Sequence, residues 1–356
     1  METIAMMNPF VVGRYVSDKY FCDREGETSF LIKQIENGRN VALISPRRLG
    51  KTGLIQHLFH QESIEKNYHA FFVDIYATTS LTEFVYLLGK AIYDELKPKK
   101  TVWTERFFQI ITSLRAGFKL DMVTGEPSFD IGLGDIQAPQ TTLDEIFAYL
   151  ETADKPCIVA IDEFQQIGGY EEKNVEALLR TKIQQCKQTM FIFSGSKRHL
   201  MSNMFNSSSK PFYQSAISIG LEPIPIHIYV EFANRLFEQR GKLIDKSVIE
   251  EVYRMFDGYT WFVQMIMNEL FALTEEGERC SMDKNVILTQ ESSYKDLLAN
   301  LAPKQKLVLQ AIAKEGRAEG LTSSAFIKKY KLPSASSVQS AVKPLLKNDL
   351  ITQEDG

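Results

Sequence analysis

Cysteine and histidine are scarce in this chain of 356 residues. No two of the four cysteines form a C-x-x-C pair, and the five histidines show no spacing typical of metal ligands. The sequence therefore predicts neither a zinc site nor a disulfide framework, and its cysteine usage is typical of a reducing compartment. The cysteines are Cys22, Cys157, Cys186 and Cys280.

Long apolar runs are also missing. No stretch of about 18 consecutive apolar residues occurs, which predicts that no helix spans a membrane. The N-terminal stretch 1–8 has no basic start and no apolar core, so it is not typical of a secretory signal. Together these absences favour a cytoplasmic protein.

The charge is unevenly distributed along the chain. The net charge is −4, with 44% hydrophobic and 24% charged residues, as in an ordinary globular protein of about two or three domains. Residues 302–348 contain nine lysines and arginines but two acids, so this segment carries +7 and the remainder −11. A basic C-terminal block on an acidic body indicates a separate module, with an anionic molecule as one candidate partner.

An apolar run, Val41–Ile44, leads into a short basic loop that ends in Gly-Lys-Thr and opens a helix. This order is typical of a phosphate-binding loop, in which backbone N–H groups and a helix N-terminus face the phosphates. The lysine, Lys51, adds a point charge, and the hydroxyl of Thr52 is placed to reach Mg²⁺. The pattern G-x-x-x-x-G-K-[ST] is broken only at its first glycine, which is a serine here. The candidate nucleotide-binding residues are Ser45, Pro46, Arg47, Arg48, Leu49, Gly50, Lys51, Thr52 and Gly53.

Further apolar runs, mostly separated by stretches of helical periodicity, indicate a parallel α/β sheet with right-handed crossovers. The expected strands cover 41–44, 70–76, 157–161, 190–196 and 216–219. Residues 98–140 interrupt this alternation. Their alternating segments, on either side of Gly125, predict a hairpin insertion.

Two adjacent carboxylates, Asp162 and Glu163, follow the strand expected over 157–161. They stand at the carboxyl end of that strand, where parallel sheets bind ligands. With the loop upstream they predict one mechanism, in which Asp162 holds Mg²⁺ together with Thr52 and Glu163 orients water for attack on the γ-phosphate. Ser194, at the end of the next strand, is either a sensor of the γ-phosphate or its attacking water, or an ordinary strand-end serine.

Four arginines are candidates for phosphate contact. Arg47 and Arg48, within the loop, either touch phosphate or pair with carboxylates elsewhere in the protein. Arg180 and Arg198 are candidates for an arginine finger, with solvated surface arginines as the alternative.

From Ile228 onward the strand pattern stops and helical periodicity continues. Expected helices cover 228–239, 246–256, 261–273 and 284–298. Three more helices precede the start of a strand, which is typical of a winged helix-turn-helix domain; they cover 303–314, 322–330 and 334–347, and the strand begins over 348–352. The expected domains are an α/β nucleotide-binding domain over 1–225, with the insertion at 98–140, a helical domain over 226–300, and a winged-helix domain with an incomplete wing over 301–356.

The basic block within 302–348 has two interpretations. Its lysines suit contacts with the DNA backbone, which would make affinity salt-dependent. The side chains placed to reach bases or phosphates are Ser334, Ser336, Ser337, Gln339 and Ser340. The alternative is a module that contacts protein or inhibits the ATPase domain, because the recognition helix itself carries few basic residues. The sequence leaves both open, and it leaves the oligomeric state open.

Five motifs in this order resemble those of the prokaryotic P-loop ATPases related to AAA+ proteins and to the STAND signalling ATPases. They are Phe21-x-Asp23-Arg24-Glu25-x-Glu27, Pro46-Arg47-Arg48-Leu49-Gly50-Lys51-Thr52, Ile161-Asp162-Glu163-Phe164-Gln165, Ser194-Gly195-Ser196 and Lys210-Pro211-Phe212-Tyr213. The resemblance covers nearly the whole chain. It implies a P-loop sheet of order 5-1-4-3-2, followed by a helical lid and a winged helix.

The same resemblance implies an adenine pocket between the sheet domain and the lid, lined by residues near Asp23, Arg24 and Glu25. The chain departs from the family in two places. Gln214-Ser215 follow the Pro-Phe-Tyr element, where members often carry Gly-Arg, so no arginine finger is expected there. The lid motif, usually Gly-Gly-x-Pro, is replaced by residues 257–261.

Three hypotheses for the function follow. The first is an ATPase that binds ATP or ADP with Mg²⁺ and acts as a molecular switch, with Glu163, Lys51 and Ser194 in catalytic roles. The second is a DNA-binding regulator or initiator-like protein in which ATP gates DNA contact. The third is an interaction module that holds nucleotide without turnover. GTP is disfavoured, because no Asn-Lys-x-Asp motif is present.

Overall fold

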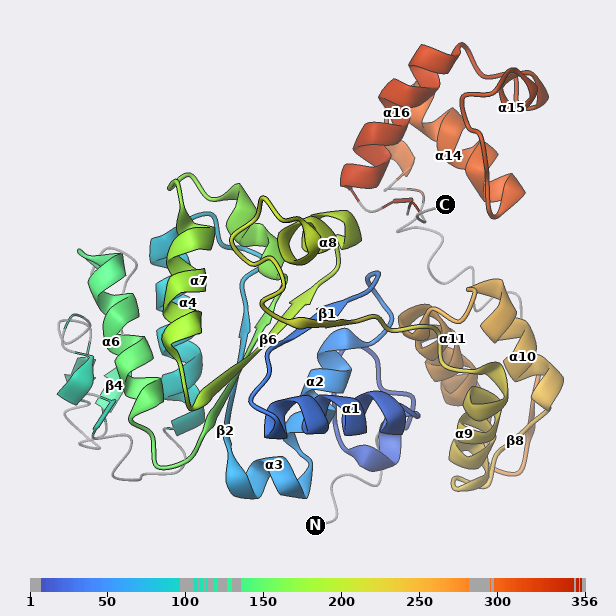
Figure 1. The fold of residues 1–356 in the computed structure, drawn as a ribbon. Coiled ribbons are helices and arrows are strands. Elements are labelled where there is room, and N and C mark those ends of the chain that lie inside the picture. Colours follow the sequence, from blue (N-terminus) through green and yellow to red (C-terminus); the bar gives the residue numbers. More distant parts are fainter. Residues whose placement is uncertain are drawn as a thin grey trace. The chain divides into compact units, whose positions relative to one another are not determined.

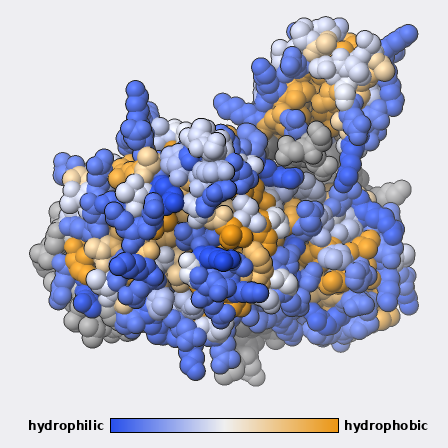
Figure 2. Space-filling model, in the orientation of Figure 1, coloured by the Kyte–Doolittle hydropathy of each residue, from blue (hydrophilic) through white to orange (hydrophobic). Residues whose placement is uncertain are grey.

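The computed structural model describes residues 8–96, 106–107, 109–111, 113, 118–120, 127–129, 136–281, 295, 298–348, 350–351 and 353. The chain divides into two compact units, Met1–Ser281 and Met282–Gly356 (Figure 1). Within the described residues, no helix is both long enough and apolar enough to cross a membrane. The surface visible in Figure 2 is mostly hydrophilic, with small hydrophobic areas between charged and polar side chains.

A five-stranded parallel sheet forms the centre of the first unit. Its strands are β1 (Val41–Ile44), β2 (His69–Asp74), β5 (Cys157–Asp162), β6 (Thr189–Gly195) and β7 (Ile217–Ile219). They lie side by side in the order β2-β5-β6-β1-β7. If these five strands are numbered 1 to 5 along the chain, their order in the sheet is 2-3-4-1-5. Read from the opposite edge, this is the expected order 5-1-4-3-2. The predicted fold class is therefore confirmed. Strands β5 and β6 are buried along their whole length because helices cover both faces of the sheet.

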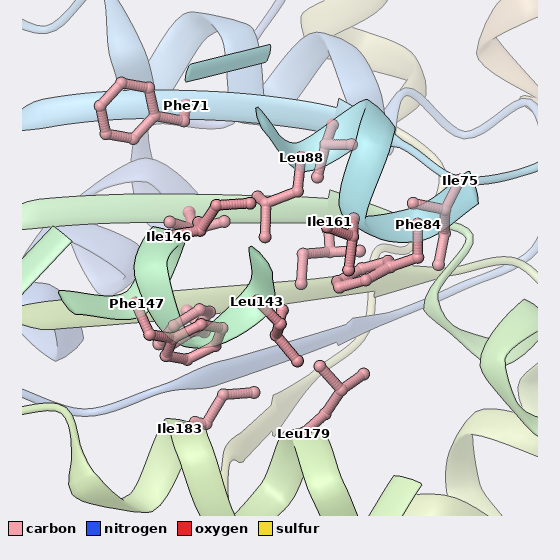
Figure 3. Close-up of a cluster of buried hydrophobic side chains, with 14 of the residues drawn as sticks. Phe71, Ile75, Phe84, Leu88, Leu143, Ile146, Phe147, Ile161, Leu179 and Ile183 are labelled. Atoms are coloured by element: carbon pink, nitrogen blue, oxygen red, sulfur yellow. The ribbon is translucent and has the colours of Figure 1, made fainter. Parts of the chain in front are cut away.

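Helices pack on each face of this sheet. On one face, α1 (Glu25–Glu36), α2 (Lys51–Phe59) and α3 (Glu62–Asn67) contribute to a buried apolar cluster with β1 and alternate residues of β5 and β6. The other face carries α4 (Leu81–Leu96), α6 (Pro139–Glu151), α7 (Val175–Gln185) and α8 (Arg198–Asn206). Figure 3 shows the second cluster, in which Phe84, Leu143 and Leu179 come from three of these helices and meet Ile161 of β5.

A short antiparallel pair stands where the insertion was expected. Strand β3 (Phe118–Leu120) pairs with β4 (Pro127–Phe129), with Phe118 opposite Phe129. Gly125, expected in the turn, lies outside the described residues.

The expected lid, a group of helices, belongs to the same compact unit as the sheet. It consists of α9 (Ile226–Glu238), α10 (Lys246–Met255) and α11 (Thr260–Leu273), with the short parallel pair β8 (Leu243–Ile244) and β9 (Arg279–Cys280). The helix expected over 284–298 lies almost wholly outside the described residues.

An N-terminal segment also packs on the lid. The Phe10 ring lies 5.6 Å from Phe237 and 5.8 Å from Phe271, between ring centroids, and Asn268 Nδ2 donates to the Phe10 carbonyl over 2.7 Å.

The second unit is built on α14 (Pro303–Glu315), α15 (Ser324–Lys329) and α16 (Ala335–Lys347), close to the three predicted helices. Ser334 caps α16 by accepting from the amide of Ser337, and seven buried apolar residues form the core of the unit: Val308, Ala311, Phe326, Leu332, Val338, Ala341 and Leu345. The strand expected over 348–352 falls partly outside the described residues. Within the described part, the Leu350 amide donates to Leu345 in a turn, and no strand forms there.

Candidate nucleotide-binding site

The phosphate-binding loop connects β1 to α2 through two residues of the left-handed region. Arg48 has φ 70° and Gly50, immediately before the helix, has φ 91°. Only glycine takes such an angle at little cost, which explains its presence before Lys51. The loop presents Arg48, Gly50 and Thr52 to solvent. The first amides of an α-helix have no acceptor within the helix, so the start of α2 is suited to receive an anion.

The Lys51 ammonium folds back over the loop. Its Nζ donates to the carbonyl oxygens of Ser45 and Pro46, each over 2.8 Å. Burial lowers the pKa of Lys51 to about 8, although the carboxylates of Asp162 and Glu163 nearby raise it. The contact also shows why a serine is accepted at the first position of the motif, since Ser45 contributes its backbone carbonyl.

Thr52 and Asp162 lie together as predicted. Thr52 Oγ1 donates to Asp162 Oδ2 over 2.7 Å. The parallel register of β2 and β5 sets Asp74 beside Asp162, and burial raises the pKa of the Asp74 carboxyl. Within the described residues, no group of three His, Cys, Asp or Glu forms a complete metal site. A hydroxyl and one carboxylate suit Mg²⁺, which takes its other ligands from phosphate and water.

Glu163 begins the turn after β5, and other side chains surround its carboxylate. Its φ of 57° lies in the left-handed region, just before the 3₁₀ helix η6 (Phe164–Gly169). Ser196 Oγ donates to Glu163 Oε2 over 2.7 Å, and Gln165 Nε2 donates to the same oxygen. Arg47 Nε lies 3.9 Å from Glu163 Oε1 and donates to Ser196 Oγ over 3.2 Å.

Sequence reasoning had not assigned Gln165 or Ser196 to the site. Ser196 was visible only as part of the Ser194-Gly195-Ser196 motif, and Gln165 as the end of the Asp-Glu-Phe-Gln motif. Gln165 follows Glu163 by two positions and Ser196 directly follows the end of β6, and these positions were the available signal.

Ser194 lies inside β6 and is fully buried. Among the described residues its Oγ has no hydrogen-bond partner. The register pairs Ile161 of β5 with Phe193 of β6, so Ser194 follows beside Asp162. A sensor role for Ser194 at the γ-phosphate stays a prediction.

A cavity of about 380 Å³ lies between the N-terminal segment and the lid helix α9. It is lined by Asp18, Phe21, Cys22, Asp23, Glu25, Ile228, Glu231, Phe232 and Arg235. The Phe21 ring stacks on His57 of α2 with 4.3 Å between ring centroids. A Cβ built at Gly53 would lie 3.4 Å from the Phe21 ring, so this ring also packs over the first turn of α2. The cavity is therefore next to the first turn of the phosphate-binding helix, and it offers two phenyl rings and four carboxylates.

Asp23 lines this cavity, whereas Arg24 is not among its lining residues. The assignment of both residues to an adenine pocket stays a prediction. Arg24 is buried and takes φ 78°. Its guanidinium donates to the carbonyl oxygens of Leu49, over 3.3 Å, and Glu222, over 2.8 Å, and pairs with Glu27 over 2.6 Å. A buried guanidinium needs such acceptors, so Arg24 turns toward the loop. It ties the loop to the segment that leads into the lid.

The other three arginines predicted as candidates for phosphate contact lie in different surroundings. Arg48 packs on the lid residues Trp261 and Phe262. Arg180 donates to Gln184 within its own helix, and Arg198 is exposed in the first turn of α8. Within the described residues, neither Arg180 nor Arg198 is hydrogen-bonded to the loop.

Two family models match the chain. Residues 21–266 match an ATPase domain predominantly from Archaea, and residues 292–356 match a probable winged helix domain. No curated protein matches the sequence significantly.

Solved structures with this architecture include two archaeal proteins. The Walker-type ATPase paby2304 of Pyrococcus abyssi is 20% identical, with a TM-score of 0.66, over 98% of this chain and 95% of that one. The ORC2 protein of Aeropyrum pernix, in ADPNP–ADP complexes, is 14% identical, with a TM-score of 0.58, over 98% and 91%. At these identities the likeness concerns the fold.

Proposed function

Because the chain belongs to the family of ATPase domains predominantly from Archaea, we propose that it is a Mg²⁺-dependent ATPase whose nucleotide state switches its lid. The observation that carries this proposal is the contact between Thr52 Oγ1 and Asp162 Oδ2, with Glu163 next in the chain. These residues stand at the open N-terminus of α2, where a triphosphate would be bound by backbone amides and by Lys51.

Each residue has a distinct role in this proposal. Lys51 leaves the carbonyls of Ser45 and Pro46 to bind phosphate oxygens. Thr52 and Asp162 hold Mg²⁺, which, when bound, neutralises charge on the phosphates. Glu163 orients a water molecule for in-line attack on the γ-phosphate and accepts its proton. The products are ADP and inorganic phosphate.

The cavity beside Phe21 is the proposed binding site for the adenine base of the nucleotide. Phenyl rings stack on a purine, and carboxylate oxygens accept from an exocyclic amino group such as that of adenine. Asp23 takes part here, whereas Arg24 acts as a brace of the loop. This arrangement supports ATP and ADP as the ligands.

The lid is connected to the loop by two arginines. Arg24 joins the Leu49 carbonyl to the Glu222 carbonyl, just before α9 begins. Arg48 contacts Trp261 and Phe262 at the start of α11. Phosphate binding that shifts the loop would therefore shift the lid, which is the physical basis of the switch.

The winged helix is the proposed contact module for DNA or for a protein. Helix α16 contains no acidic residue, and Gln339, Ser340 and Lys343 are exposed on it. A helix without acidic residues is compatible with contact to a phosphate backbone. A helix with so few lysines is equally compatible with contact to a protein. An arginine finger from a neighbouring copy would require oligomerisation, and no arginine of this chain is assigned to that role.

The test is phosphate release from ATP in the presence of Mg²⁺, with ATP binding measured in parallel. Glu163→Gln is expected to bind ATP and to lose turnover, whereas Lys51→Ala is expected to lose binding. If the wild type binds ATP and releases no phosphate, with or without DNA, the chain is a nucleotide-holding module. If turnover appears only with DNA, the DNA-gated regulator is the better description.

A further inference from the structure

The carboxylate of Glu163 is held by protein donors in this structure. Oε2 accepts from Ser196 Oγ, over 2.7 Å, and from Gln165 Nε2, while Oε1 lies 3.9 Å from Arg47 Nε. To activate water, however, a general base needs a carboxylate oxygen that is free to accept from that water. Here both oxygens face side chains of the protein.

Gln165 is buried beside Glu163, where the nitrogen of its side-chain amide is hydrogen-bonded but the oxygen is not. The residue is 4% exposed, and its Oε1 has no hydrogen-bond partner among the described residues. The same oxygen packs so closely over Gly195 that a Cβ there would lie 2.4 Å from it. A buried acceptor without a partner costs free energy, so the arrangement persists because Nε2 binds the Glu163 carboxylate.

Arg47 links this cluster to the nucleotide. It belongs to the phosphate-binding loop, but its guanidinium is directed to Ser196 and Glu163 and lies 5.1 Å from the centroid of the Tyr76 ring. Guanidinium groups bind phosphate oxygens through paired hydrogen bonds. A triphosphate on the loop therefore competes with Ser196 and Glu163 for Arg47.

We propose that Gln165, Ser196 and Arg47 form a latch that holds Glu163 away from the attacking water. Phosphate loosens this latch by drawing Arg47 toward the nucleotide, while Gln165 and Ser196 continue to restrain Glu163 during turnover. Gln165 and Ser196 are positioning residues, since they act only through Glu163. The inference rests on the proposed ATP hydrolysis and adds its regulation: turnover is restrained by this chain's own side chains. ATP binding as such does not depend on the two positioning residues.

The test compares steady-state ATP hydrolysis by the wild type, Gln165→Leu and Ser196→Ala. Leucine keeps the volume that packs over Gly195 and removes the donor. Loss of one charge-assisted hydrogen bond to Glu163 is expected to raise kcat by about fivefold to tenfold, with KM and the Kd for ATP unchanged. Addition of Glu163→Gln to either variant must abolish the gain.

Gln166→Leu is the matched control, because Gln166 is the neighbouring glutamine and donates to the Tyr76 carbonyl. Its kcat is expected to equal that of the wild type. Should Gln165→Leu fail to fold, Ser196→Ala carries the test, since Ser196 is only partly buried.

Two results would overturn the latch while leaving hydrolysis intact. One is a lower kcat in both variants with ATP binding retained, which would mean that the two residues hold Glu163 productively. The other is an unchanged kcat. If ATP binds and no protein in the series releases phosphate, the latch and the proposed hydrolysis fail together.

Discussion

The amide nitrogen of Trp261 donates to the carbonyl oxygen of Arg48 over 3.0 Å, which joins the first turn of the lid helix to the phosphate-binding loop. The guanidinium of Arg48 lies 5.1 Å from the Trp261 ring centroid and 4.5 Å from that of Phe262. A loop residue is therefore held by the lid through both its backbone and its side chain. Any movement of the loop around a phosphate must move or break this contact.

Trp261 should consequently report nucleotide binding by its fluorescence. The chain has two tryptophans, and Trp103→Phe leaves Trp261 as the only one. Titration of this variant with ATP and Mg²⁺ is expected to change the emission of Trp261, because the cation above its ring shifts. Lys51→Ala in the same background is the control and should give no change. Calorimetric binding of ATP without any fluorescence change would show that the loop and lid are not coupled.

The affinity for ATP should fall as the pH rises above about 8. In the free protein, burial lowers the pKa of Lys51 to about 8. Phosphate favours the ammonium form, so the bound state has the higher pKa and binding takes up a proton above pH 8. The Kd is expected to rise by up to about tenfold per pH unit in that range. Calorimetry at several pH values measures this slope.

Lys51→Arg is the control for the pH effect, because a guanidinium stays charged throughout this range. Its Kd should be independent of pH up to about pH 10. A wild-type Kd that does not change between pH 7 and pH 9.5 would show that Lys51 is already charged, or not engaged with phosphate.

Arg24→Ala should be strongly destabilising. The substitution leaves the carbonyl oxygens of Leu49 and Glu222 without their donor and Glu27 without its partner, at a site where Arg24 is buried. We expect a loss of about 2–4 kcal/mol in the free energy of unfolding, measured by urea denaturation.

The comparison for Arg24 is Arg254→Ala. Arg254 forms an exposed pair with Glu250 on α10, and such pairs contribute about 0.5 kcal/mol or less. Equal unfolding midpoints for the two variants would mean that Arg24 does not brace the loop.

DNA binding by the winged helix should show in the salt dependence of affinity. If about three lysines neutralise phosphates, the affinity for duplex DNA falls roughly 40-fold between about 50 and 200 mM salt. Fluorescence anisotropy of labelled duplex with the full chain measures this change. Lys343→Glu on α16 should weaken binding, whereas Lys246→Glu, the same charge reversal on the lid, should not. Absence of binding at low salt would leave protein contact as the role of the domain.

Local patterns in the sequence were sufficient for the strands, the loop and the meeting of Thr52 with Asp162. The strands and the loop each depend on a short apolar run or on a motif within a few residues. Thr52 and Asp162 are 110 positions apart, and their meeting was expected because two such motifs combine in one mechanism. The strand order came from family resemblance, because periodicity does not decide which strands become neighbours. Helix α8 and the pair β8–β9 were not predicted, as both elements are short and follow polar stretches.

The contacts around Glu163 and Arg24 were beyond sequence reasoning for a different reason. Arg24 and Glu222 are 198 positions apart, and Arg47 and Ser196 are 149 apart. Only the packed sheet and lid bring them together. Phe10 packs against Phe237 and Phe271 of the expected lid, and one buried phenylalanine leaves no periodic pattern that predicts this.

The switch itself is tested most directly by hydrogen–deuterium exchange of the lid helices, residues 226–273, in two nucleotide states. Glu163→Gln with ATP and Mg²⁺ holds the state before hydrolysis, and the same variant with ADP holds the state after it. We predict different protection at the start of α11, where Trp261 meets Arg48. Identical exchange across the lid, with both nucleotides shown to be bound, would contradict a nucleotide-driven switch.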